Sequence, residues 1–95
     1  MDLRALRYFV EVVRQNGFTR AAEHLHVTQP TISKMVKALE DELGGPLLTR
    51  AGRSVQLTDA GQLVYDQGLL LLDQAHLLRQ QVAEVDGMAR GELSI

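Results

Sequence analysis

The chain has no cysteine or tryptophan, only two prolines, and only four other aromatic residues in 95 positions. The lack of cysteine excludes disulfides and thiolate metal sites. Long apolar runs are also lacking, since the longest extends only from Leu69 to Leu72. Such a run cannot form a signal peptide or a membrane span. A hydrophobic content of 45% suffices for the core of one small domain. We therefore expect a soluble, cytoplasmic protein.

An excess of basic residues is lacking too, because the net charge is −2. This argues weakly against nucleic acid as a partner, but the distribution of charge matters more. Residues 1–57 hold 8 basic and 6 acidic side chains, whereas residues 58–95 hold 2 basic and 6 acidic ones. The N-terminal part is thus mildly basic and the C-terminal part acidic, which indicates a separate role for each part.

The stretch from Thr28 to Leu43 predicts a helix with a buried face. Thr28 is a good N-cap, Pro30 suits the first turn, and Gly44 follows as a stop. One apolar stripe forms at about 100° per residue. Its members are Ile32, Met35, Val36, Leu39 and Leu43.

The opposite face of this helix lacks acids over its N-terminal half. Pro30, Ser33, Lys34 and Lys37 lie there, and the first acid is Glu40. Because a helix dipole favours acids in the first turn, their absence suits a helix whose N-terminus points at a polyanion. An ordinary solvated surface helix explains the same face without any ligand.

The segments before this helix complete a motif. Asp2 is expected to cap a first helix that Gly17 ends, and Thr19 to cap a short second helix. Residues 26–27 then form a tight turn before Thr28. A short helix, a turn and a longer helix make a helix-turn-helix, whose second helix enters the DNA major groove.

After Pro46 the helical periodicity disappears. Two short extended pieces flank a turn at Gly52, with Arg50 before it and Arg53 after it. This pattern predicts a small β-hairpin, a wing, whose arginines can reach a phosphate or a narrow minor groove. A plain solvent-exposed hairpin is the alternative.

The last element predicts a long helix with more apolar surface than one small domain can cover. It begins at Thr58 and Asp59 and runs to about Val85, which is about 42 Å. The excess surface needs a partner, most simply a second copy in a parallel or antiparallel pair. The a/d seam consists of Val64, Gly68, Leu71, Ala75, Leu78, Val82 and Val85. A flexible break is expected from Gly87 to Gly91, and the start of a strand after it.

From Leu6 to Ile95 the chain resembles the N-terminal part of LysR-type transcriptional regulators. The matching positions are Phe9, Val13, Phe18-Thr19-x-Ala21-Ala22-x-x-Leu25, Thr28-Gln29-Pro30-x-Ile32-Ser33-x-x-Val36-x-x-Leu39-Glu40-x-x-Leu43-Gly44, Leu47-Leu48-x-Arg50 and Leu57-Thr58-x-Ala60-Gly61. So many matches at fixed spacing are far more specific than a lone helix-turn-helix pattern.

The resemblance implies a mainly α fold with three domains or segments. These are a winged helix-turn-helix of three helices and a two-stranded wing over residues 1–57, a dimerisation linker helix over 58–87, and at 88–95 a hinge and the start of an absent effector-binding domain. It also implies promoter DNA as the target, with imperfect dyads of the form T-N11-A, homodimers or tetramers, and RNA polymerase as a further candidate partner. No cofactor is expected in this fragment, because a small-molecule effector would bind the absent domain.

The resemblance also carries over DNA contacts. The family's recognition-helix contacts are matched by Gln29, Pro30, Thr31, Ser33 and Lys34. Its wing contacts are matched by Arg50 and Arg53. An amide at Gln29 can pair twice with adenine, and Pro30 and Thr31 can contact a thymine methyl. The phosphate contacts are assigned to Thr28, Ser33, Lys34 and Lys37, and a minor-groove contact to Arg50 or Arg53.

Two other classes of function compete with DNA binding. An enzyme is not supported, since His24 and His26 are two apart and face different sides of a helix, and no metal-binding HExxH spacing occurs. We therefore expect no catalytic residues and no metal site. A winged helix used only for protein contact is the more serious rival, because the net charge is negative and aromatics are few.

Overall fold

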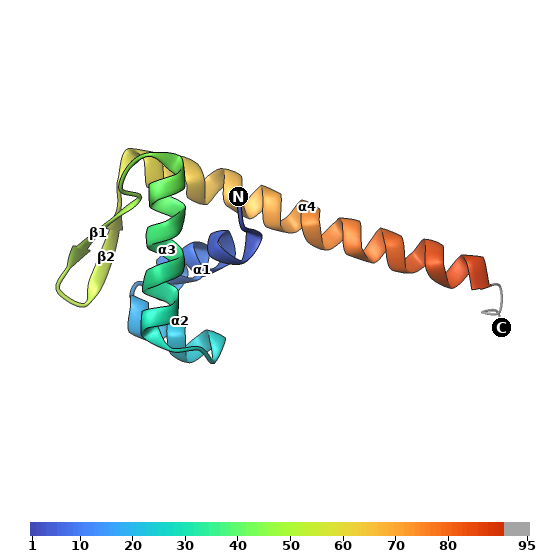
Figure 1. Cartoon of the computed structure of the whole chain (residues 1–95), viewed down its shortest axis with the longest axis horizontal. Coiled ribbons are helices and arrows are strands. Elements are labelled where there is room, and N and C mark those ends of the chain that lie inside the picture. The colour runs from blue at the N-terminus through green and yellow to red at the C-terminus, as the bar shows by residue number, and fades with distance from the viewer. Residues whose placement is uncertain (91–95) are drawn as a thin grey trace.

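The computed structural model describes residues 1–90, and the side chains of residues 1–87. It confirms a mainly α winged helix-turn-helix followed by a long helix (Figure 1). The elements in chain order are α1 (Leu3–Gln15), α2 (Phe18–Leu25), α3 (Gln29–Leu43), β1 (Leu48–Ala51), β2 (Ser54–Leu57) and α4 (Asp59–Arg90).

Side-chain caps begin three of the four helices. Asp2 Oδ1 accepts from the Arg4 N–H at 2.8 Å, Thr28 Oγ1 from the Thr31 N–H at 3.3 Å, and Thr58 Oγ1 from the Gly61 N–H at 2.9 Å. Each bond satisfies a backbone donor that the first helical turn leaves free. The predicted starts of α1, α3 and α4 are therefore confirmed.

The corner between α1 and α2 differs from the prediction. Asn16, not Gly17, ends α1 in the left-handed conformation with φ 55°, which asparagine tolerates better than most residues. Gly17 is instead the N-cap of α2, and Thr19 lies inside the first turn. A Cβ at Gly17 would lie 2.9 Å from the Arg53 carbonyl oxygen, so the nearby wing backbone accounts for glycine here.

The core lies where α1, α2 and α3 meet the base of the wing. Its largest fully buried side chains are Leu6, Phe9, Val12, Ile32, Leu39 and Leu47. Ile32, Val36 and Leu39 confirm the predicted apolar stripe of α3, although Leu43 at its end is 42% exposed. Burial of this stripe leaves the opposite face of α3 free for another partner.

The wing is the predicted hairpin, an antiparallel pair in which Leu48 faces Leu57 and Arg50 faces Val55. Gly52 makes the turn with φ 63°, a conformation that glycine adopts without strain. The base of the wing is tied to α3, because the Glu40 carboxylate accepts from the Leu47 N–H at 2.7 Å and the Leu48 N–H at 3.3 Å.

Helix α4 packs across α1 and then continues away from the domain (Figure 1). It is 32 residues long, or about 48 Å at 1.5 Å per residue. Because it remains helical through Arg90, the break predicted to begin at Gly87 is wrong for residues 87–90. A single internal glycine costs a helix only about 1 kcal/mol, which the continuing backbone hydrogen bonds outweigh. The strand predicted at residues 92–95 lies outside the described residues.

Among the described residues, no helix combines the length and the apolar character needed to cross a membrane.

Candidate nucleic-acid interface

The exposed face of α3 brings the predicted recognition residues together. Four of them fall within about 100° of arc around the helix, on the side opposite the buried stripe, namely Pro30, Ser33, Lys34 and Lys37. Their flanks are occupied by Gln29 on one side and Thr31 on the other, and Thr28 sits at the tip. Pro30, Thr31, Lys34 and Lys37 are exposed, whereas Gln29 and Ser33 are half-buried.

Two hydrogen bonds at the start of α3 orient four of these side chains. Gln29 Nε2 donates to Ser33 Oγ at 2.8 Å, and the Thr28 and Thr31 hydroxyl oxygens lie 2.8 Å apart. Among the described residues, neither the side-chain oxygen of Gln29 nor its second amide N–H has a partner, so both are available to a ligand. One donor and one acceptor side by side is the pattern that pairs with the major-groove edge of adenine.

The two lysines of α3 differ in their surroundings. Lys37 Nζ lies 3.1 Å from Asp41 Oδ1, one turn later, in a pair whose side chains are both well exposed. Lys34 has no ion-pair partner within residues 1–90. Lys34 is therefore the lysine with its charge fully available to a phosphate, whereas a contact from Lys37 competes with Asp41.

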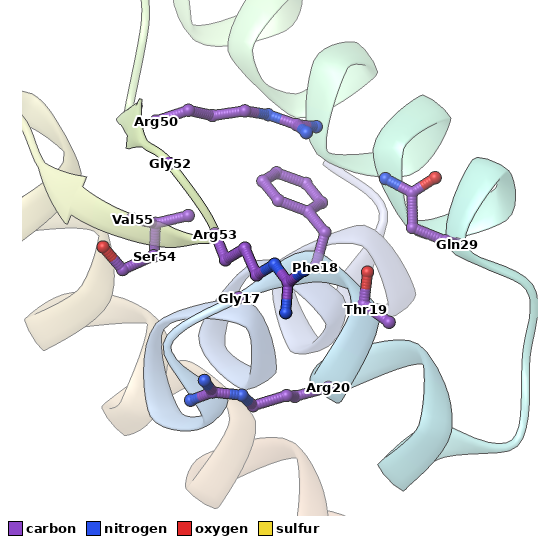
Figure 2. Close-up of a pocket in the computed structure, with 10 residues that line it drawn as sticks. All are labelled: Gly17, Phe18, Thr19, Arg20, Gln29, Arg50, Gly52, Arg53, Ser54 and Val55. Atoms are coloured by element: carbon purple, nitrogen blue, oxygen red, sulfur yellow. The ribbon is translucent and has the colours of Figure 1, made fainter.

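The wing places its two arginines differently. The Arg50 guanidinium carbon lies 4.1 Å from the centre of the Phe18 ring, which is a cation–π arrangement. Figure 2 shows Arg50 reaching from the wing over this ring toward α3, whereas Arg53 lies nearer Gly17 and Thr19. Arg53 follows the turn residue Gly52 and is exposed. The two cations thus have separate positions above one groove.

That groove, of about 390 Å³, separates the wing from the start of α2 and α3 (Figure 2). It is lined by Arg50 and Arg53 of the wing, by Gln29 of α3, and by Thr19 and Arg20 of α2. The sequence-based prediction missed Thr19 and Arg20 as members of this surface. The sequence offered little indication of their position, because a lone threonine and a lone arginine in a short helix do not show that the wing folds back beside them.

The three histidines form no site with acids in the described part of the chain, where no group of three potential metal ligands occurs. His24 Nε2 lies 3.6 Å from Glu11 Oε1, whose carboxylate also accepts from Gln15 Nε2 at 3.2 Å. Glu11 is buried, and its contact with His24 joins α1 to α2, whereas its bond with Gln15 lies within α1.

A second candidate surface is the uncovered side of α4. Four of the predicted interface residues are strongly exposed there, from 47% to 66% of their surface, and the adjoining row Leu63, Leu70 and Leu77 is exposed as well. The four are Leu71, Leu78, Val82 and Val85. Contiguous apolar surface of this kind marks an interaction site in a water-exposed helix.

The remaining three predicted interface residues lie elsewhere. Gly68 is buried, and a Cβ there would lie 2.9 Å from Leu6 Cδ1, so Gly68 serves the crossing of α4 over α1. Val64 is half-buried against the same core. The same chain thus covers the beginning of the predicted seam, and the assignment of these two residues to a dimer interface stays a prediction. Ala75 is half-buried in a groove of about 820 Å³ between α1 and α4.

Both the sequence and the fold of this chain are similar to those of known proteins. Residues 3–62 match the model of the bacterial regulatory helix-turn-helix proteins of the lysR family. The whole chain is 45% identical to a probable cat1 operon transcriptional activator of Acinetobacter lwoffii, of which it covers 31%. It is 41% identical to the HTH-type transcriptional regulator BudR of Klebsiella aerogenes, of which it covers 66%.

Solved structures agree. The DNA-binding domain of BenM in complex with catB site 1 DNA is 38% identical, with a TM-score of 0.86 over 90% of this chain and 96% of that one. The DNA-binding domain of CbnR in complex with DNA is 34% identical, with a TM-score of 0.85 over 90% of this chain and 99% of that one. The chain thus spans about a third of the length of the Acinetobacter protein but nearly all of these two isolated domains. The chain belongs to the lysR family of bacterial regulatory helix-turn-helix proteins.

Proposed function

We propose that this chain is the DNA-binding and dimerisation part of a bacterial transcriptional regulator, with α3 in the major groove and the wing in the adjacent minor groove. The observation that carries this is the outward face of α3, free of acids over its N-terminal half, beside a groove that the wing arginines line. The similar domains of BenM and CbnR, solved with DNA, support it.

Within α3, we assign base reading to Gln29 and positioning to the residues around it. The Gln29 amide offers a donor and an acceptor to a base edge. Pro30 and Thr31 present apolar atoms to a thymine methyl. Lys34 holds a phosphate through its charge, with Thr28, Ser33 and, when freed from Asp41, Lys37 as further phosphate contacts.

Within the wing, Arg53 is the better candidate for the minor groove. It is exposed beside the hairpin turn, where a side chain can enter a narrow groove. Arg50 is held over the Phe18 ring and reaches toward α3, so we assign it to the phosphates between the two grooves.

The exposed apolar side of α4 is proposed to pair with a second copy of the chain. Two joined half-site readers act as one bivalent ligand, which raises affinity for a dyad without new contacts. Residues 1–57 would then be the reader and α4 the dimerisation helix. The effector-binding domain would follow, with tetramers, an inducer and contact with RNA polymerase as properties of the whole cytoplasmic regulator.

A fluorescence-anisotropy titration tests the function. The chain is titrated into a labelled T-N11-A dyad and into a scrambled duplex of equal length, at several salt concentrations. We expect tighter binding to the dyad and a log K that falls linearly with log salt, by about 0.9 for each phosphate neutralised.

The other outcomes separate the alternatives. Equal binding to both duplexes would keep DNA as the ligand and refute this operator. If no duplex binds at low salt while light scattering shows a dimer, DNA binding is refuted, and the fold serves protein contact instead.

A further inference from the structure

The two halves of the wing are anchored to different parts of the domain. At the base, the Glu40 carboxylate holds the Leu47 and Leu48 N–H groups, and the Thr58 N–H donates to the Leu47 carbonyl at 3.0 Å. These bonds do not reach the turn at Gly52. A hairpin of two four-residue strands is at best marginally stable alone, so its outer half needs further contacts.

Those contacts come from the α1–α2 corner, residues 16–18. Asn16 Oδ1 accepts from the Val55 N–H at 3.2 Å, across 39 positions of sequence and on the edge of β2 away from β1. At Gly17 the missing Cβ lets the Arg53 carbonyl oxygen approach. The Phe18 ring lies beneath the Arg50 guanidinium.

The corner also connects the wing to the recognition helix. Phe18 is the first residue of α2, and α2 packs on α3, so the three contacts relate the wing to α3 through one short link. Gly17 and Phe18 of this link are buried, whereas Asn16 is exposed. Figure 2 shows Phe18 between the two arginines of the wing and Gln29 of α3, with Gly17 beside Arg53. A link of this kind holds the two DNA-reading elements at a set separation before DNA arrives.

We propose that Asn16 is a positioning residue for minor-groove reading: its bond to the Val55 N–H holds the outer half of the wing so that Arg53 meets the minor groove while α3 occupies the major groove. This rests on the proposed function. Since Asn16 touches no DNA in this scheme, it acts through Arg53. A wing free to move would have to be ordered on binding, and that ordering weakens the minor-groove contact.

Asn16 offers a matched pair of variants. Asn16→Gly keeps the left-handed backbone and removes the acceptor, whereas Asn16→Asp keeps an acceptor and a residue tolerant of that backbone. Both are titrated with two dyads that differ only in the minor groove under the wing, A·T-rich or G·C-rich. A third dyad carries one changed base pair under α3.

We expect Asn16→Gly to reduce the preference for the A·T-rich flank by about 2- to 10-fold, the range of one lost hydrogen bond. Discrimination of the base pair under α3 should stay as in the parent chain. Asn16→Asp should restore the flank preference, even if its charge lowers affinity for both duplexes alike. Hydrogen exchange of the Val55 amide should be faster in Asn16→Gly and slow again in Asn16→Asp.

Three results would overturn the proposal. These are an unchanged flank preference in Asn16→Gly, a loss in Asn16→Asp equal to that in Asn16→Gly, and an equal loss of discrimination under the wing and under α3. If the parent chain shows no flank preference, the minor-groove part of the proposed function fails, and this proposal with it. If the parent shows that preference and the variants do not differ, only this proposal fails.

Discussion

At the scale of single residues, Gln29 is the side chain that we assign to base reading, whereas its polar neighbours are assigned to phosphate contacts. Its Nε2 is engaged by Ser33, which fixes the direction of the remaining donor and acceptor. We predict that Gln29→Ala costs about 1–3 kcal/mol on the preferred dyad and relaxes the choice of base there. Anisotropy titrations against a set of dyads, each with one base pair changed, measure this. Equal weakening on every duplex would rule out base reading by Gln29.

Lys34 and Lys37 make a matched pair for the phosphate contacts. Because Lys34 has no ion-pair partner in the described chain and Lys37 lies beside Asp41, we predict unequal effects. Lys34→Ala should weaken binding to all sequences alike and reduce the slope of log K against log salt by about 1. Lys37→Ala should change the slope less. Equal slope changes would show that Asp41 does not restrain Lys37.

At the scale of elements, the glycines of α4 report where this helix touches its own domain. A Cβ at Gly61 would lie 1.9 Å from the Leu47 carbonyl oxygen and 3.1 Å from Leu57 Cδ2. The first turn or the wing base would have to move, so we predict that Gly61→Ala lowers the free energy of unfolding by about 1–3 kcal/mol or more. Urea unfolding followed by circular dichroism measures this change.

Gly87→Ala is the control for that helix, because a Cβ at Gly87 meets no atom within 4 Å. Alanine is the better helix former by about 1 kcal/mol, so this variant should unfold no more easily than the parent. A destabilised Gly87→Ala would show that the far end of α4 is in close contact with something, such as a second copy of the chain.

At the scale of the whole molecule, the far half of α4 is an apolar surface that the described residues leave uncovered. The structure is 56 Å in its longest dimension, and Leu71 and Leu78 are 47% and 58% exposed. We predict that replacing both by serine shifts a dimer to a monomer without unfolding the domain, since burial of each leucine in a dimer contributes about 1.5–3 kcal/mol. Sedimentation velocity measures the association, and dyad affinity should fall with it.

The matched control for that experiment is Gln80→Ser, which changes an exposed residue on the opposite side of α4. It should leave association and dyad affinity unchanged. If the double serine variant remains dimeric, the chain associates through another surface. The groove between α1 and α4 that contains Ala75 would then be the next candidate.

Local features of the sequence were sufficient to predict the elements and the outward face of α3. The caps at Asp2, Thr28 and Thr58 act on backbone N–H groups two or three residues away, and the stop at Gly44 acts on a neighbouring carbonyl. Periodicity shows which side of α3 is buried, so the outward side follows without knowledge of the fold. The turn at Gly52 is also local, because it requires a positive φ.

Contacts between distant segments had to come from the tertiary structure. The Asn16–Val55 bond, the close approach of Arg53 to Gly17 and the Arg50–Phe18 stack each depend on where the wing folds back. The same holds for α4, where heptad spacing marks an apolar side but does not say which turns lie on α1. Gly68 was therefore assigned to a dimer although it packs on Leu6. A pattern of side chains shows that a surface must be covered, and only the packed fold decides what covers it.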